Sequence, residues 1–260
     1  TTDAETLPNG FRYSVVDMSL DGGNGAVTTV KNILIYTPTT ESLGITKHAN
    51  GIDFWVVTHE WDNNNFNAHL LTASGLSSVP VTTAIGLPIS GSGFQAAGSI
   101  KLSPSGSKLA ITSVSDFAQL YDFDANTGVL SNVVTLTTEA GELSGIAFSP
   151  DESLLYISNS FGKIHQFNLN AADIPNSITT IYNGGWIPPI GQMQVGPDNK
   201  IYVAVNNRTK LGVINNPNIL GLGCNFILDG IDLSGRLSRL GLPSFNQSFF
   251  APSIRFQNSC

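Results

Sequence analysis

The sequence predicts an all-β fold, a β-propeller of four-stranded blades. Three stretches carry this prediction, because they repeat one pattern: SIKLSPSGSKLAI at 99–111, GIAFSPDESLLYIS at 145–158 and MQVGPDNKIYVAV at 193–205. Each has an apolar run, a proline, a small or acidic turn and a second apolar run. The prolines lie roughly 46 and 47 residues apart, which is the spacing of propeller blades.

Each repeated stretch is expected to be a hairpin. Pro104, Pro150 and Pro197 end its first strand, because proline cannot donate to a β-ladder and favours the turn that follows. The second strands are rich in apolar and β-branched residues, as expected of buried strands. They span 108–113, 154–158 and 200–205.

Further strands complete each repeat to four. Another second strand is predicted at 49–59, third strands at 12–23, 67–75, 119–128, 163–172 and 210–218, and fourth strands at 25–36 and 132–139. No stretch longer than about ten residues has a helical period. The chain therefore holds about five repeats. A β-sandwich has similar strand spacing, but it does not require a repeat of this length.

The first repeat is incomplete, because residues 1–36 supply only a third and a fourth strand. In one alternative, residues 242–256 pair with 1–36 and close a five-bladed ring. In the other, the chain is a fragment and further blades lie upstream or on another chain. We expect one propeller domain over 1–256, with 257–260 beginning a linker to a following domain.

Composition excludes several partners. Only 12% of the residues are charged and the formal net charge is −7, so a phosphate backbone would be repelled and nucleic-acid binding is not expected. No apolar run reaches the roughly 18 residues that a membrane-spanning helix requires, so no membrane insertion is expected. The two cysteines, Cys224 and Cys260, are too few for a disulfide scaffold, and they are as readily explained by one bridge as by two free thiols.

No catalytic set can be ordered from the sequence. It contains neither a Gly-x-Ser-x-Gly nucleophile motif nor a phosphate-binding loop. The four histidines lack metal-binding spacing, so no metal site or cofactor is predicted. An enzyme with its site at the propeller axis would require Glu41, His48, His59 or Asp116 to converge there, with Ca²⁺ as a possible ion.

Two loops are the candidate ligand sites. The segment EWDNNNFN at 60–67 places Trp61 beside Asp62 and Asn64, and NGGWIPP at 183–189 carries Trp186. Exposed aromatic rings beside amides and carboxylates suit contacts to sugars. Asp62 and Asn64 have the spacing that opens a calcium loop, but the glycine and the distal glutamate are missing. An Asn-rich hairpin turn and aromatic caps on blade ends are the competing structural explanations.

Taken together, several motifs resemble the WD40-like propeller domain of very large secreted proteins of Bacteroidetes. These motifs are YSVVDMSLDGGNGAV (13–27), KHANGIDFWVVTH (47–59), GSIKLSPSGSKLA (98–110), LYDFDANTG (120–128), FSPDESLLYIS (148–158), IHQFNL (164–169), QMQVGPDNKIYVA (192–204), VINNPN (213–218), GCNF (223–226) and GLPSF (241–245). Such proteins often carry polycystic-kidney-disease-type repeats downstream and end in a gliding-motility-associated or type IX secretion sorting domain.

The resemblance implies a domain of about seven blades, of which this chain holds about five, and so favours the fragment alternative. It implies an extracellular, cell-surface location and offers no catalytic residue to transfer. We therefore expect a non-catalytic binding or adhesion module whose loops contact a polysaccharide or a protein. The alternatives are a lactonase- or lyase-like propeller enzyme that acts on a sugar or lactone, and a structural spacer.

Overall fold

The computed structural model describes residues 9–114, 117–137, 143–185 and 188–249. Within these ranges the strands form six antiparallel sheets, one of five strands, three of four and two of two. The predicted all-β, propeller-like fold is confirmed. No helix in these ranges is long and apolar enough to cross a membrane.

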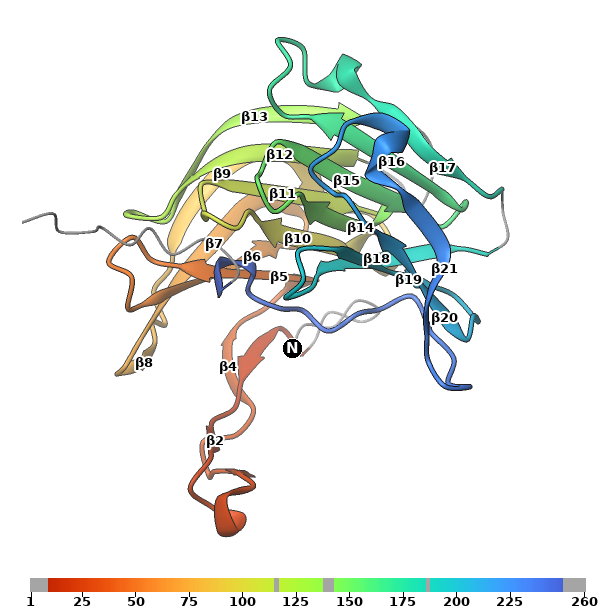
Figure 1. Ribbon diagram of the computed structural model, residues 1–260. Helices are drawn as coiled ribbons and strands as arrows, with labels where there is room; N and C mark the ends of the chain where they lie inside the picture. The colour runs from red at the N-terminus through yellow and green to blue at the C-terminus, as the bar shows by residue number, and fades with distance from the viewer. Residues whose placement is uncertain (1–8, 115–116, 138–142, 186–187, 250–260) are drawn as a thin grey trace, which may run out of the picture.

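The four larger sheets are blades, numbered 1 to 4 in chain order and stacked as successive layers (Figure 1). Blade 1 contains β5 (Thr39–Lys47), β6 (Phe54–Glu60), β7 (Asn63–Thr72), β8 (Gly75–Leu76) and β9 (Val81–Ile89). Blade 2 contains β10 (Gly98–Leu102), β11 (Lys108–Ser113), β12 (Phe117–Asp124) and β13 (Val129–Thr137). Blade 3 contains β14 (Leu143–Phe148), β15 (Leu154–Asn159), β16 (Lys163–Asn168) and β17 (Thr179–Asn183). Blade 4 contains β18 (Ile190–Val195), β19 (Ile201–Val205), β20 (Lys210–Ile214) and β21 (Phe226–Asp232).

The repeated stretches are the inner hairpins of blades 2, 3 and 4, as predicted. In the first, the Ser103 amide donates to the Lys108 carbonyl at 2.9 Å, and the Gly106 amide donates back to the Ser103 carbonyl at 2.9 Å. Gly106 has φ 76°, and Glu152 and Asn199 take the left-handed position in the other two turns with φ 60°. Short residues or glycine suit that conformation best, so the glutamate is the unusual member.

The blades pack face to face through side chains that alternate along each strand. Leu109 and Ile111 of β11 join a cluster with Trp55 and Val57 of blade 1, while Ala110 faces blade 3. β15 divides its residues in the same way between blades 2 and 4. Because successive side chains point to opposite faces of a sheet, a strand between two blades must be apolar at every position. This explains the continuous apolar runs of the second strands.

The incomplete first repeat is a hairpin over residues 11–36, in which β1 (Phe11–Tyr13) pairs with β4 (Ile33–Tyr36) and β2 (Val16–Asp17) with β3 (Ala26–Val27). Its base packs on blade 1, where the Tyr36 ring stacks on His69. The rest projects away from the blades (Figure 1). The expected five repeats are thus four blades and one hairpin, and blade 1 has a fifth strand because β8 folds back on the end of β7.

The row of blades is open at its ends. Inner strands β5, β10, β14 and β18 pack in that order, and among the described residues no comparable packing joins β18 back to β5. The alternative in which residues 242–256 pair with 1–36 is not seen in the described part, 242–249. That part forms no strand, and it crosses the inner strands β5, β10 and β18 instead.

Gly106 shows how tightly neighbouring blades fit. A Cβ added there would lie 2.5 Å from Thr46 Oγ1 of blade 1, whereas a Cβ at Gly51, with φ 74°, would meet nothing within 4 Å. Gly51→Ala is expected to lower the free energy of unfolding by about 1–2 kcal/mol through the left-handed backbone alone. Gly106→Ala should lower it by roughly a further 1–3 kcal/mol through the clash.

Urea unfolding of the two variants measures the difference. Equal losses of unfolding free energy in Gly51→Ala and Gly106→Ala would show that the turn of blade 2 does not fix the position of blade 1.

Candidate functional site

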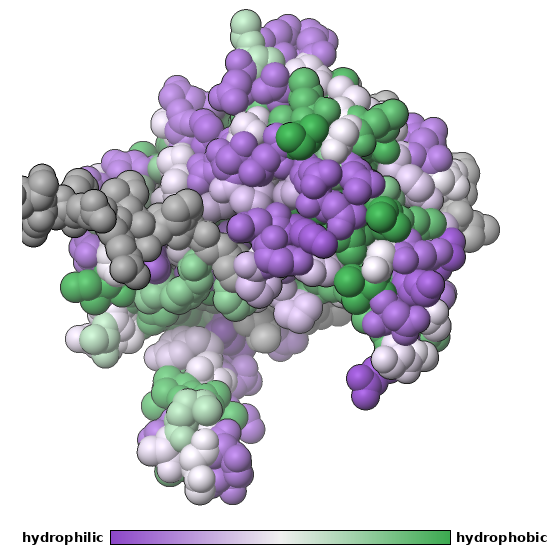
Figure 2. Space-filling model, viewed as in Figure 1, coloured by the Kyte–Doolittle hydropathy of each residue, from purple (hydrophilic) through white to green (hydrophobic). Residues whose placement is uncertain are grey.

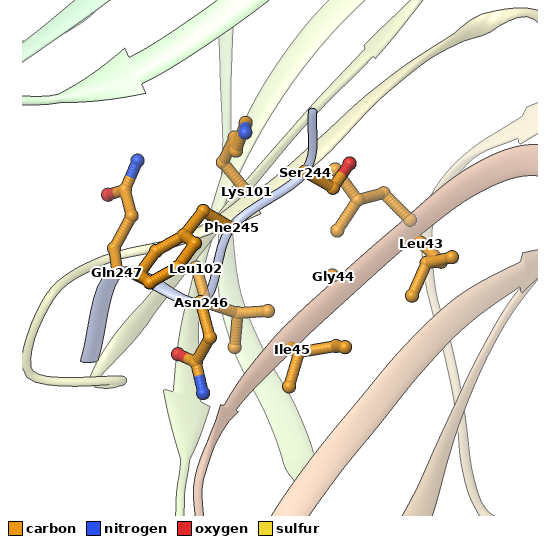
Figure 3. Close-up of a pocket in the computed structure, with 10 residues that line it drawn as sticks. Leu43, Gly44, Ile45, Lys101, Leu102, Ser244, Phe245, Asn246 and Gln247 are labelled. Atoms are coloured by element: carbon orange, nitrogen blue, oxygen red, sulfur yellow. The ribbon is translucent and has the colours of Figure 1, made fainter. Parts of the chain in front are cut away.

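The C-terminal strap, residues 238–249, crosses the axis at which the inner strands meet. It is tied to blade 4 where the Gln192 amide donates to the Leu240 carbonyl at 2.7 Å. At its other end the Phe249 ring lies 6.0 Å from that of Phe54 on blade 1. Figure 3 shows this strap passing over β10 and β5. The axis is therefore partly filled by the chain's own backbone.

Small residues make this close approach possible. A Cβ on Gly191 would collide with the Leu240 carbonyl of the strap, and a Cβ on Gly145 would collide with the carbonyl of Gly191. Ser99 of β10 spans two blades, because its hydroxyl donates to the Ser144 carbonyl of β14 at 2.7 Å. Backbone, glycine and serine thus form part of the axial surface.

Lys101 is the exception to this lining. It lies on β10 between Ile100 and Leu102, which face blade 1, and its ammonium donates to Gln194 Oε1 of β18 at 2.8 Å. The residue keeps some exposed surface, but desolvation lowers the pKa of Lys101 to about 8. At neutral pH it is therefore still mostly a cation.

A polar cavity of about 110 Å³ lies beside this lysine. Its polar side chains come from three inner strands and the strap, and they are Glu41, Ser42, Ser99, Lys101, Gln192 and Ser244. A smaller cavity of about 40 Å³ shares Lys101 and Ser244 and continues under Asn246 and Gln247 (Figure 3). An axial enzyme site would require Glu41, His48, His59 or Asp116, and of these Glu41 lines this cavity. Asp116 lies outside the described residues.

The histidines lie in separate surroundings. His59 is buried with its ring edge against Phe66, and desolvation lowers the pKa of His59 to about 4. Burial also lowers the pKa of His69, which is packed beneath the hairpin. His48 accepts the Asn50 amide in a turn. Among the described residues, no group of three histidine, cysteine or acidic side chains could hold a metal ion.

The predicted ligand residues Trp61, Asp62 and Asn64 lie together at the turn between β6 and β7. Trp61 is half-buried against the core between blades 1 and 2, and the Asp62 amide donates to the Ile89 carbonyl at 2.8 Å. The Asn64 amide donates to the Gly86 carbonyl at 3.2 Å. The Asp62 side chain is exposed. The turn is thus rigid, and its role in binding stays a prediction.

Three asparagines of this loop donate hydrogen bonds to one carboxylate. Glu60 accepts hydrogen bonds from Asn63, Asn65 and Asn67 at 2.8, 2.9 and 2.8 Å. Burial raises the pKa of Glu60, but these three amides outweigh it and hold the pKa below its ordinary value. The Asn-rich composition is therefore explained, in part, by a fan of amides on one charged group.

Two further positions from the sequence are Trp186 and Cys224. Trp186 lies outside the described residues. Cys224 is a buried thiol beside Tyr156, burial raises the pKa of Cys224, and its sequence partner Cys260 also lies outside the described residues. Buried thiols with a raised pKa are poor nucleophiles.

Lys101 is not among the site residues predicted from the sequence. A signal was present, since SIKLS places a charged residue in an inner strand whose other residues are apolar or small. The strap gave no such signal, because a segment without strand pattern does not reveal which surface it covers.

Comparison with known protein families finds no match, and no curated protein matches. Solved structures do match. A candidate 6-phosphogluconolactonase from Bacteroides fragilis NCTC 9343 is 14% identical with a TM-score of 0.55, over 85% of this chain and 65% of that one. Another from Bacteroides uniformis ATCC 8492 is 17% identical with a TM-score of 0.52, over 85% and 66%. Such structural neighbours are propeller-like. The fold is that of a propeller.

This likeness shows the fold alone, because the identities are low. The chain spans about two thirds of the length of these two structures. Four blades and a hairpin, open at both ends, agree with a match to part of a larger ring.

The amide fan on Glu60 can be tested residue by residue. Asn65→Ala is expected to raise the pKa of Glu60 toward its ordinary value, because one donor is removed. Because the folded pKa is lowered, Glu60 contributes stability above its unfolded pKa and loses it as the pH falls through the folded pKa. Asn65→Ala should therefore reduce the loss of stability in acid.

Asn64→Ala is the matched control, since Asn64 bonds Gly86 instead of Glu60. NMR titration of the Glu60 side-chain carboxyl carbon measures its pKa in both variants. An equal rise of this pKa in Asn64→Ala would contradict the role of the three amides.

Proposed function

We propose that this chain is a non-catalytic binding and adhesion module. The observation that carries the proposal is the axis, where the described inner strands present backbone, glycine and serine around Lys101, and where no histidine or thiol of the described residues lies. Ser99 and Lys101 lie there, but the Ser99 hydroxyl donates to the Ser144 carbonyl and the Lys101 ammonium to Gln194, so these two are not paired as nucleophile and base. A row of packed blades that presents its turns to solvent is suited to binding.

The wider setting is part of the same proposal. The resemblance to the WD40-like propeller domain of type IX-secreted and gliding-motility-associated proteins of Bacteroidetes supports display at the cell surface. The composition agrees with this, because the chain is weakly charged and rich in uncharged polar residues. The proposed ligand is a surface polysaccharide, contacted at the turn that contains Trp61, Asp62 and Asn64.

An enzymatic role has less support. The two candidate 6-phosphogluconolactonases are similar in fold, and hydrolysis of such a lactone would need cationic groups for the phosphate. The described axis offers only Lys101, which is already bonded to Gln194. We therefore do not transfer that activity to this chain.

A glycan array tests the binding function. The intact protein is expected to bind a small set of bacterial surface polysaccharides, and Asp62→Ala should weaken that binding about tenfold, since an exposed carboxylate that bonds a sugar hydroxyl contributes roughly 1.5–3 kcal/mol. Asp229→Ala is the control, because Asp229 is an equally polar surface residue on β21 of blade 4. A blank array across all glycans would contradict the proposal.

We also propose that the open ends of the row are completed by further blades of the same protein. The projecting hairpin carries apolar residues on its surface (Figure 2). Val16, Met18, Val27 and Leu34 are 53, 63, 52 and 44% exposed. At the other end, blade 4 carries an apolar groove of about 380 Å³. Its apolar lining includes Val195, Pro197, Tyr202, Leu242, Pro243 and Phe245.

The groove lies on the face of blade 4 opposite to the face that packs on blade 3. Ile201, Val203 and Val205 of β19 pack toward blade 3, so Tyr202 between them faces the open side. A groove with almost no hydrogen-bonding group suits another apolar sheet face better than a sugar, which would need such groups. Another blade is therefore the occupant we propose.

A hydrophobic dye tests this surface. 8-Anilinonaphthalene-1-sulfonate is expected to fluoresce with this chain, and Tyr202→Glu should lower the signal, because a carboxylate interrupts the apolar groove. A longer chain that includes further blades should bind little dye. Ile52→Glu is the control, because Ile52 is an exposed apolar residue that does not line the groove. Concentration-dependent dimers in light scattering would point instead to a second copy.

A further inference from the structure

We propose that the axial cavity beside Lys101 binds a small carboxylate anion of about the size of acetate. The proposal concerns the axis and is independent of the polysaccharide site proposed at the β6–β7 turn.

The first observation is an ammonium without a counter-ion. Lys101 Nζ has three hydrogens to donate, and its partner is the neutral Gln194 Oε1 at 2.8 Å. Among the described residues, no carboxylate forms an ion pair with it. A partly desolvated charge is costly unless it is paired, so the site favours an anion.

The second observation is an unmet amide in the adjoining cavity. Gln247 is only 2% exposed, and neither its Oε1 nor its Nε2 has a hydrogen-bond partner among the described residues. Buried amides normally have partners, so an empty pair of sites is unusual. Gln247 and Lys101 line the same cavity, together with Ser244 (Figure 3).

These groups specify the chemistry of the ligand. A carboxylate supplies the missing negative charge and two acceptor oxygens, which the free hydrogens of Lys101 and the Nε2 of Gln247 can donate to. The two cavities that Lys101 lines, of about 40 and 110 Å³, exceed the roughly 10–15 Å³ that one water needs, so an anion with a few non-hydrogen atoms fits beside the ammonium. A cavity of about 270 Å³ adjoins the larger one at Glu41, Gly98 and Gln192. Glu41 also lines the larger cavity, and its charge disfavours a dianion.

Acetate is the probe. The intact protein is titrated with sodium acetate against sodium chloride at constant ionic strength, and Tm and the line width of ¹³C-acetate are recorded. We expect a saturable rise in Tm with acetate and none with chloride. Benzoate should have no effect, because its ring exceeds the cavity. An equal response to chloride or benzoate, or no response to acetate, overturns the proposal.

Lys101→Met is expected to weaken acetate binding roughly tenfold or more, the loss of one charge-assisted hydrogen bond. It should fold, since an apolar side chain of similar length replaces an uncompensated charge. Lys31→Met is the control, because Lys31 is exposed on the projecting hairpin. Unchanged acetate affinity in Lys101→Met refutes the site.

A second variant separates binding from folding. Gln247→Leu removes two unmet polar atoms, so it should raise Tm in the absence of acetate and weaken acetate binding. Opposite effects on the two readouts are the signature of a residue kept for a ligand. A fall in Tm in the absence of acetate would show that Gln247 serves packing, and would count against the proposal.

Discussion

The structure depends on one constraint, the face-to-face packing of sheets whose strands are buried on both sides. β11 and β15 meet it with runs of apolar residues, Leu109–Ile111 and Leu154–Ile157, whose side chains alternate between the blade before and the blade after. Each blade therefore has no core of its own. It shares one core with each neighbour, so its stability depends on both neighbours being present.

That constraint explains the two ends of the row. The hairpin of residues 11–36 and blade 4 each have a neighbour on one side only, and both expose apolar side chains. The strap covers part of blade 4 and reaches blade 1, so it buries some inner-strand surface that would otherwise face solvent. A surface of this kind signals a missing sheet more than a ligand.

The sequence predicts the blades well because the inner hairpin is a local structure. The second strand expected at 108–113 coincides with β11, since apolar runs and turn residues are read within a few positions. The strap and the contact between Lys101 and Gln194 could not be predicted in this way. They join residues far apart in the sequence, and only the side-by-side packing of the inner strands β10, β14 and β18 brings them together.

The same contrast bears on function. On blade 1 the Glu60 carboxylate accepts hydrogen bonds from three asparagines, so a role in folding explains these residues. At the axis, the hydrogen-bond partner of Lys101 is the neutral Gln194, and neither polar atom of the Gln247 side chain has a partner among the described residues. Burial makes an unmet charge or polar group costly, and the anion proposed for this cavity would supply an acceptor to both residues.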